Sequence, residues 1–173
     1  MSKPRVYTVT IDVDKRKALK DALDRMRKTA VYVGIPADSE QDKRPDKAPI
    51  TKAQLGYIHE YGSPSANIPA RPFLRPGVQK AEGSLRKTMK RAATAVLAEN
   101  EAGFQREMET VAHKAETAVK DYMNSGEFEP LAPSTIKKRK SKIEKLGSED
   151  MTIKPLIDTG NLQNSIAGLV VEE

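Results

Sequence analysis

The chain has 173 residues and a mass of 19.1 kDa, which suffices for one domain with its own core. Lysine and arginine outnumber aspartate and glutamate by 30 to 24, which gives a net charge of +6, and aromatic residues make up only 5%. The absence of cysteine excludes a disulfide framework, thiol catalysis and a cysteine-ligated metal, and two histidines argue against a histidine-rich metal centre. No apolar stretch approaches the ~20 residues that span a bilayer, so we expect a soluble protein made inside the cell.

The N-terminal part predicts two strands around one helix. Residues 6–13 alternate between apolar and polar side chains, which is typical of a half-buried strand. From Asp14, a candidate N-cap, apolar residues recur at helical spacing as far as Met26. Residues 30–35 are rich in β-branched side chains and predict a second strand, and the polar residues 37–49 predict an exposed loop.

A short helix is expected next, with Thr51 as its N-cap, an apolar side that reaches Tyr61, and Gly62 at its end. Residues 65–76 contain three prolines, so no regular helix is expected there.

The longest periodic signal runs from Val78 to Tyr122, where apolar residues recur about every 3.7 residues, interrupted only by Asn100. A continuous helix of this length would measure about 70 Å. Glycine weakens a helix, so the segment around Asn100 and Gly103 is the expected bend or break, where the chain can fold back.

The C-terminal part predicts a linker over 126–133, a basic helix over 134–146, a turn over 158–160 and a closing strand over 169–171. Together these elements predict one α+β domain over residues 1–173. A small antiparallel or mixed sheet would pack against one dominant long helix plus short helices, with a mobile loop near 37–50 and a basic segment over 127–150.

The sequence gives little indication of catalysis. His59 and Glu60 are neighbours, and adjacent side chains on a helix point about 100° apart, so they cannot easily share a ligand. A metal-dependent hydrolase that uses these two residues with Asp158 is therefore the least favoured alternative. A structural histidine, hydrogen-bonded by the backbone or a neighbouring loop, is preferred. We expect no enzyme activity, no catalytic residue, no cofactor and no metal.

The loop that enters the long helix is stiffened by Pro69, Pro72 and Pro76, which fix φ and favour extended neighbours. We expect Phe73 and Leu74 to be buried from this loop. Two interpretations stay open: a rigid helix entry alone, or an entry whose Arg71 and Arg75 also contact a partner.

A basic run follows Pro133 and could approach nucleic acid, because lysine and arginine near a duplex displace counterions without reading sequence. Its candidate DNA-facing residues are Lys137, Lys138, Arg139, Lys140 and Lys142. No aromatic residues are interleaved, so base stacking is not indicated. A solvated surface without a ligand is the equally weighted alternative.

Three segments taken together, "YIHEYGSPSANIPARPFLRPGV", "PLAPSTIKKRK" and "KPLIDTGNLQNSI", resemble the neck and tail-completion proteins of tailed bacteriophages. In that family a strand ending in V-G-I-P, a helix with H-E-[FY]-G and an I-P-A-R-P-F-L-R-P loop come in this order. A long helix, a P-L-x-P-[ST]-T-I segment and a final L-I-D-T-G-x-L-x-x-S-I motif follow. Many relatives carry an aromatic residue directly before P-L-x-P, where this chain has Glu129, and Phe128 is the candidate substitute.

The resemblance implies a structural role in the virion, as a ring around the DNA channel between the head connector and the tail tube. The implied partners are further copies of the chain, six in all, the connector or adaptor, the tail tube or terminator, and packaged DNA through non-specific contact. Tail completion, tail termination and head completion are not distinguished, and synthesis in the host cytoplasm is expected. The family-motif and interface residues are His59, Glu60, Tyr61, Gly62, Ile68, Pro69, Arg71, Pro72, Phe73, Leu74, Arg75, Pro76, Asp158, Thr159, Gly160, Leu162, Ser165 and Ile166.

A second class of function stays open beside this one. A small basic nucleic-acid-binding protein, acting as a monomer or dimer, would account for the positive charge without any assembly. Oligomeric state and salt-dependent DNA binding distinguish the two.

Overall fold

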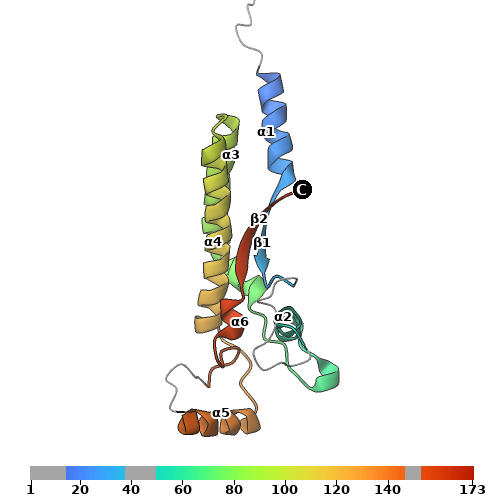
Figure 1. Cartoon of the computed structure of the whole chain (residues 1–173), viewed down its shortest axis with the longest axis vertical. Helices are drawn as coiled ribbons and strands as arrows, with labels where there is room; N and C mark the ends of the chain where they lie inside the picture. The colour runs from blue at the N-terminus through green and yellow to red at the C-terminus, as the bar shows by residue number, and fades with distance from the viewer. Residues whose placement is uncertain (1–14, 38–49, 147–152) are drawn as a thin grey trace, which may run out of the picture.

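The computed structural model describes residues 15–37, 50–146 and 153–173. The predicted strand at 6–13, its neighbour Asp14 and the loop at 38–49 lie outside the described residues. Figure 1 shows an elongated arrangement of long helices and a small sheet. The elements in chain order are α1 (Arg16–Lys28), β1 (Thr29–Gly34), α2 (Lys52–Tyr61), a 3-10 turn (Pro64–Ala66), α3 (Leu74–Leu97), α4 (Glu101–Ser125), α5 (Pro133–Leu146), α6 (Asn161–Asn164) and β2 (Ala167–Glu172).

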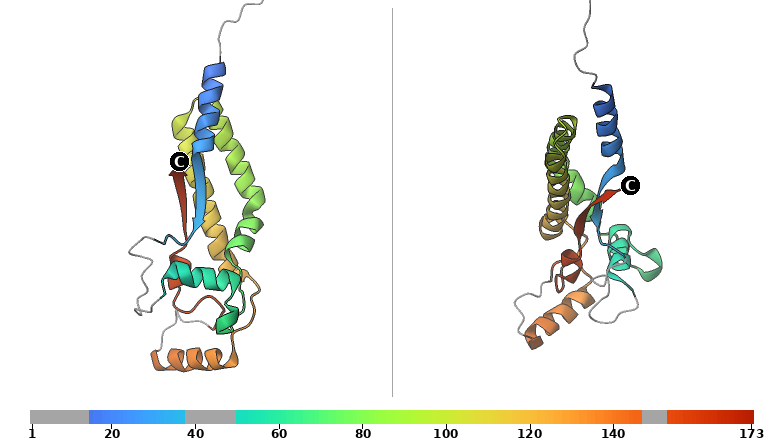
Figure 2. Two further views of the ribbon diagram at one scale, coloured as in Figure 1. Left: turned by 90° about the vertical axis from the view of Figure 1, so that its right-hand side faces the viewer. Right: turned by 45° about the horizontal axis from the view of Figure 1, so that its top comes forward.

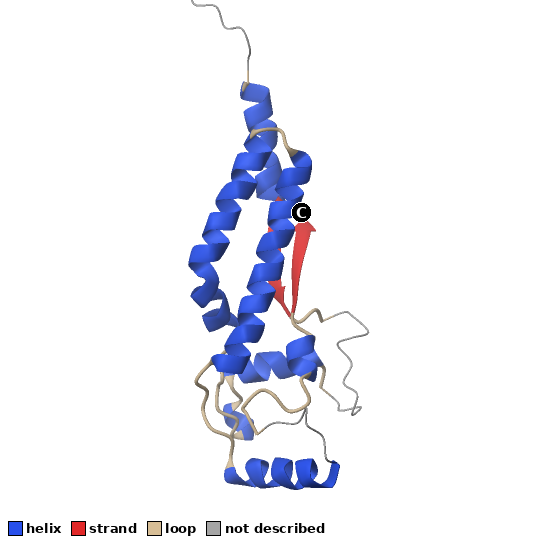
Figure 3. Ribbon diagram, turned by 90° about the vertical axis from the view of Figure 1, so that its left-hand side faces the viewer, coloured by secondary structure: helices blue, strands red, loops and turns tan. Residues whose placement is uncertain are grey.

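The α+β class is confirmed, but the dominant helix is a pair. α3 and α4 form a helical hairpin in which the two helices run side by side (Figures 1 and 3). The chain reverses at Glu99, whose φ of 56° is left-handed, and Asn100 begins α4 by accepting the backbone N–H of Gly103 at 2.9 Å. The chain therefore folds back at the predicted break, and the periodic segment forms two helices.

β1 and β2 form a two-stranded antiparallel sheet that joins the two ends of the described chain. The register pairs Tyr32 with Leu169 and Val33 with Gly168. One face of the sheet packs on α4, and a Cβ on Gly168 would lie only 2.2 Å from the Ala112 carbonyl oxygen. Glycine at this position allows the strand to approach the helix closely.

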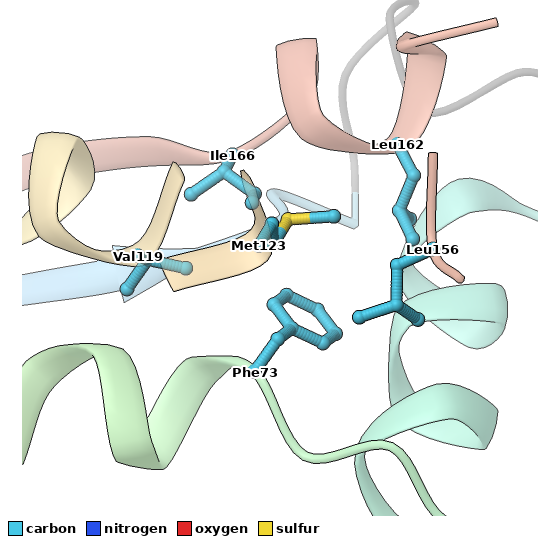
Figure 4. Close-up of a cluster of buried hydrophobic side chains, with 6 residues drawn as sticks. All are labelled: Phe73, Val119, Met123, Leu156, Leu162 and Ile166. Atoms are coloured by element: carbon cyan, nitrogen blue, oxygen red, sulfur yellow. The ribbon is translucent and has the colours of Figure 1, made fainter. Parts of the chain in front are cut away.

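Two apolar clusters lie along the hairpin. One joins α1, the tip of the hairpin and the sheet, and its buried residues are Ala22, Ala92, Val96, Phe104 and Met108. The other lies at the opposite end (Figure 4), and its buried residues are Phe73, Val119, Met123, Leu156, Leu162 and Ile166. The predicted stripe is displaced by one residue at the end of α4. Val119 and Met123 are buried there, in place of the neighbouring Ala118 and Tyr122, because this turn faces both α3 and the C-terminal segment.

α3 begins earlier than the proline-rich sequence predicted. Its first residue is Leu74, and Pro76 lies within its first turn, where a backbone N–H has no helical acceptor to lose. Phe73, directly before the helix, is 2% exposed as predicted, whereas Leu74 is only half-buried. Tyr61 was assigned to the apolar side of α2 and is instead 60% exposed. In the described part of the chain, no helix has the length and apolar character to cross a membrane.

Candidate functional site

The first motif folds into one closed turn that Glu60 holds together. Its carboxylate accepts the backbone N–H groups of Phe73 at 2.7 Å, Leu74 at 2.9 Å and Arg75 at 3.1 Å. α3 thus receives its N-terminal cap from α2, and the negative charge lies at the positive end of the helix dipole. Gly62 turns the chain between them at a φ of 77°, where a Cβ would contact the backbone of Ala70 at 2.9 Å.

Arg71 joins this turn to the second motif. Its Nε donates to the Glu129 carbonyl at 2.7 Å, and its Nη2 donates to the Pro130 carbonyl at 2.8 Å. The side chain is only 7% exposed, so its charge is removed from solvent and its donors serve the backbone of the segment before α5. Phe128 packs against the apolar cluster that contains Phe73. Its ring lies edge-on to that of Tyr122, with 5.6 Å between the ring centroids.

Arg139 joins the second motif to the third. Its Nη1 donates to the carbonyls of Lys154 and Ile157, both at 2.8 Å, and its Nε lies 3.6 Å from the Asp158 carboxylate. Its side chain is 16% exposed. The structure therefore removes Arg139 from the set of DNA-facing residues, because its guanidinium is held against the C-terminal segment.

The third motif is a turn that inserts two apolar side chains into the core. Gly160, at a φ of 73°, precedes the short helix α6, and Leu162 and Ile166 on either side of its end are buried in the cluster of Figure 4. Ser165 donates to the Leu162 carbonyl at 2.7 Å, and Thr159 is exposed. Most of this motif therefore serves packing.

A cavity of about 370 Å³ lies where the three motifs meet. His59 lines it, and its buried Nδ1 has no hydrogen-bond partner among the described residues, so the bond expected of a structural histidine is not seen at this nitrogen. Burial, and then the positive charges of Arg71 and Arg139, lower the pKa of His59 to about 4. The imidazole is consequently neutral at physiological pH, in a cavity whose walls carry more cations than carboxylates among the described residues.

The remaining motif residues lie on the surface of the same turn. Pro69, Pro72 and Arg75 are exposed, and Ile68 is half-buried and forms a backbone bridge to Ser63. The charge of Arg75 is therefore available to a partner, whereas that of Arg71 is not.

α5 presents the lysines of the basic run to solvent. Lys137, Lys138, Lys140 and Lys142 are all exposed, and Figure 1 shows the helix lying across the lower end of the molecule, apart from α3 and α4. A shallow depression along the helix is lined by lysine and serine side chains. Such a surface can contact phosphate groups, and it offers no means to read bases.

An apolar groove that no sequence motif indicated lies on the other side of α2. The groove measures about 550 Å³ between β1, α2 and the start of α3, and Tyr57 and Tyr61 stand at its rim with ring centroids 4.7 Å apart. Both rings are more than half exposed. Their spacing of four residues on a helix was a usable signal, because such residues lie on one face.

The arrangement offers little for catalysis. Both oxygens of Glu60 accept backbone N–H groups, so this carboxylate is not free to act with His59. Among the described residues, no group of three or more metal-ligating side chains is present. Comparisons of the chain with protein-family models, curated proteins and solved structures found no match.

Proposed function

We propose that this chain is a structural, non-enzymatic subunit of a tailed-bacteriophage virion. It would form a ring at the neck or tail end, around the DNA channel between the head connector and the tail tube. The observation that carries the proposal is the convergence of the three motifs of the resemblance. Arg71 ties the first to the second, and Arg139 ties the second to the third.

This convergence matters because short motifs arise by chance independently of one another. Residues 57–76, 130–140 and 154–166 are far apart in sequence, yet the hydrogen bonds of two arginines unite them at one end of the molecule. A shared structural module explains why these segments would occur together in a family. The motifs therefore support a common architecture more strongly than they support any particular contact.

The surface is also suited to a ring subunit. Tyr32, Leu169 and Val171 are 53%, 47% and 37% exposed on the outer face of the sheet, which leaves apolar area for contact between copies. The charge of +6 is moderate. A ring of mildly basic subunits would attract DNA without holding it so tightly that passage is hindered.

The decisive experiment is a cryo-electron microscopy reconstruction of phage particles that carry this gene product. We expect the chain as a closed ring of six copies around the tail axis or in the neck. Its absence from mature virions, or its presence as a single asymmetric copy, would contradict the proposal. Particles made without the gene product serve as the control, and their difference density identifies the position of the ring.

The exposed lysines of α5 favour one second candidate, a small nucleic-acid-binding protein that acts as a monomer or dimer. Light scattering after gel filtration gives the oligomeric state, and duplex DNA titrated at several salt concentrations gives the number of phosphate contacts. Tight, salt-dependent binding by a protein that is absent from virions would favour this candidate over the ring.

A further inference from the structure

The outer edge of β1 has unused backbone hydrogen-bonding groups. The Gly168 N–H donates to the Glu116 carboxylate at 3.1 Å, and it therefore points away from β1. Since pairs alternate along an antiparallel ladder, the backbone groups of Val33, paired with Gly168, and of Val31 also point away from β2. No hydrogen bond from another described residue reaches the N–H or C=O groups of Val31 and Val33.

This edge lacks the usual protection against further pairing. The strand reads TAVYVG, without a charge or a proline, and it is one of two strands in the described sheet. On its outer face, the exposed Tyr32 lies beside Leu169 of β2. The edge of β2 differs, because Glu116 of α4 already occupies its Gly168 N–H. An added strand would therefore join at β1.

The chain contains a segment with the properties of such a strand. Residues 6–13 have Tyr7, Val9, Ile11 and Val13 on one side of the alternation, with Thr8, Thr10 and Asp12 on the other. Threonine and β-branched residues favour extended pairing, and the alternation gives the segment one apolar face.

The length of α1 limits how far residues 6–13 could reach along the β1 edge of their own chain. In chain order α1 follows the segment and leads directly into β1, as a helix of 13 residues, about 20 Å long (Figure 2). Only two residues separate position 13 from Arg16. Folded back along α1, an extended run of eight residues spans at most ~29 Å. Its first residues would thus barely pass the start of β1 and could not cover both Val31 and Val33.

We propose that residues 6–13 of one copy add as a third strand to the β1 edge of a second copy. The backbone of the added strand would satisfy the free groups of Val31 and Val33, and its side chains would extend the faces of the sheet. A contact between two different surfaces is heterologous, and its repetition gives a ring when the rotation from copy to copy closes and an open filament when it does not. This inference rests on the proposed function for the ring, whereas the strand contact itself is tested on the purified protein.

The absence of cysteine makes engineered disulfides a direct test. One preparation of the full chain carries Tyr32→Cys, and a second, size-tagged preparation carries a single cysteine at one position between 7 and 12. The backbone N–H and C=O of Tyr32 point toward β2, so Tyr32 would form a non-hydrogen-bonded pair with a residue of an antiparallel strand added at the other edge. The Cβ atoms of such a pair lie close together, which suits a disulfide. After mixing and mild oxidation, we expect a mixed-size covalent dimer that is at least tenfold enriched at one position and falls off along the scan.

Lys137→Cys, exposed on α5, replaces Tyr32→Cys in the matched control. Mixed dimers no more abundant than in this control at every position would overturn the proposal. A third preparation carries Tyr32→Cys and the second cysteine in the same chain, and a disulfide that forms only within this chain, at the monomer mass, would also overturn the proposal. If virions contain the ring but the cross-link does not form, the proposed phage function stands and this strand contact is rejected. If the cross-link forms but the protein is absent from virions, the strand contact stands and the phage function is rejected.

A second measurement checks the contact without cysteine. Val9→Pro with Thr10→Pro removes one backbone donor on each edge of the segment, so one of the two donors would face β1 in either register and its loss prevents ladder formation. We expect self-association, measured by light scattering, to fall at least tenfold while the thermal unfolding of the domain is unchanged. Unchanged association would overturn the proposal. Thr8→Ala with Thr10→Ala, which keeps all backbone donors, is the control.

Discussion

The Glu60 carboxylate accepts the backbone N–H of Phe73 at 2.7 Å, so the last turn of one helix caps the first turn of the next. The same carboxylate bonds the two following N–H groups. A single side chain thereby fixes the angle between α2 and α3 and holds the Phe73 ring in the core (Figure 4).

Removal of this cap should destabilise the protein. We expect Glu60→Ala to lower the free energy of unfolding by about 2–3 kcal/mol, because three backbone N–H groups lose a charged acceptor. Urea denaturation measures the loss. Glu82→Ala removes an exposed glutamate that pairs with Arg86 on α3, and it should cost less than ~0.5 kcal/mol. Equal losses in the two variants would show that the cap contributes nothing.

Phe73→Ala should cost about 3–5 kcal/mol, since the ring is 2% exposed and is surrounded by the apolar cluster at this end of the hairpin. Leu74→Ala should cost less, because its side chain is half-buried. Chemical denaturation of each variant is the measurement, with Tyr57→Ala as an exposed aromatic control. A loss below ~1 kcal/mol for Phe73→Ala would show that the ring is not buried in the folded protein.

The depressed pKa of His59 makes stability depend on pH. Its folded pKa of about 4 is below the ordinary 6.5, so between these values the unfolded chain binds more protons. The contribution of neutral His59 is complete above pH 6.5 and is lost as pH falls toward 4. We expect His59→Gln to remove on the order of 1–2 kcal/mol of the acid destabilisation, allowing for partial exposure.

Urea midpoints of wild type and His59→Gln at pH 7 and pH 4.5 test this dependence. His113→Gln, which replaces the exposed second histidine, is the control. Parallel pH profiles for wild type and His59→Gln would refute the assignment.

The lysines of α5 and the arginine beside them should separate into surface and structural roles. Charge reversal of Lys137, Lys138, Lys140 and Lys142 should leave unfolding within ~0.5 kcal/mol of wild type and impair DNA binding or DNA retention in particles. Arg139→Ala should instead destabilise the protein by about 1–3 kcal/mol, because two backbone carbonyls lose their donor.

Salt-dependent titration with duplex DNA provides the readout for the lysines. Reversal of the four exposed basic residues Lys80, Arg86, Lys87 and Lys90 on α3 changes the net charge equally and is the matched control. Equal losses of DNA binding in both variants would indicate a response to net charge alone. If DNA binding and ejection are normal after the charges of the four α5 lysines are reversed, this helix has a solvated surface without a DNA ligand.

Sequence patterns predicted most helices and strands, because caps and apolar periodicity depend on residues that are neighbours in the sequence. Thr51 forms its capping box with Gln54, and β1 and the basic helix lie within one residue of their expected starts. The course of the chain between elements depends on tertiary contacts that no local pattern contains. The apolar period continued through Asn100, yet the turn at Glu99 reversed the helix because two apolar faces could cover each other.

The sequence predicted the candidate site as three separate motifs. In the structure, hydrogen bonds from two arginines to backbone carbonyls hold the three motifs together. For Arg71, partner contact was one of two open interpretations beside a rigid helix entry, and for Arg139, DNA contact stood beside a solvated surface. Their actual acceptors are backbone carbonyls 58 and 18 residues away in sequence. A residue's type does not predict such acceptors, because every residue carries the same carbonyl.

The pairing of β1 with β2 has a consequence for synthesis. The helical hairpin is formed by neighbouring sequence, whereas the sheet unites residues 29–34 with residues 167–172. The core cluster containing Ile166 therefore closes only after the ribosome has passed the last strand. Until then, Val31 and Val33 lack their neighbours on β2, and the nascent chain offers apolar surface to chaperones and proteases. A copy that ends before β2 never completes this closure, so its first strand stays without the partner that forms the sheet.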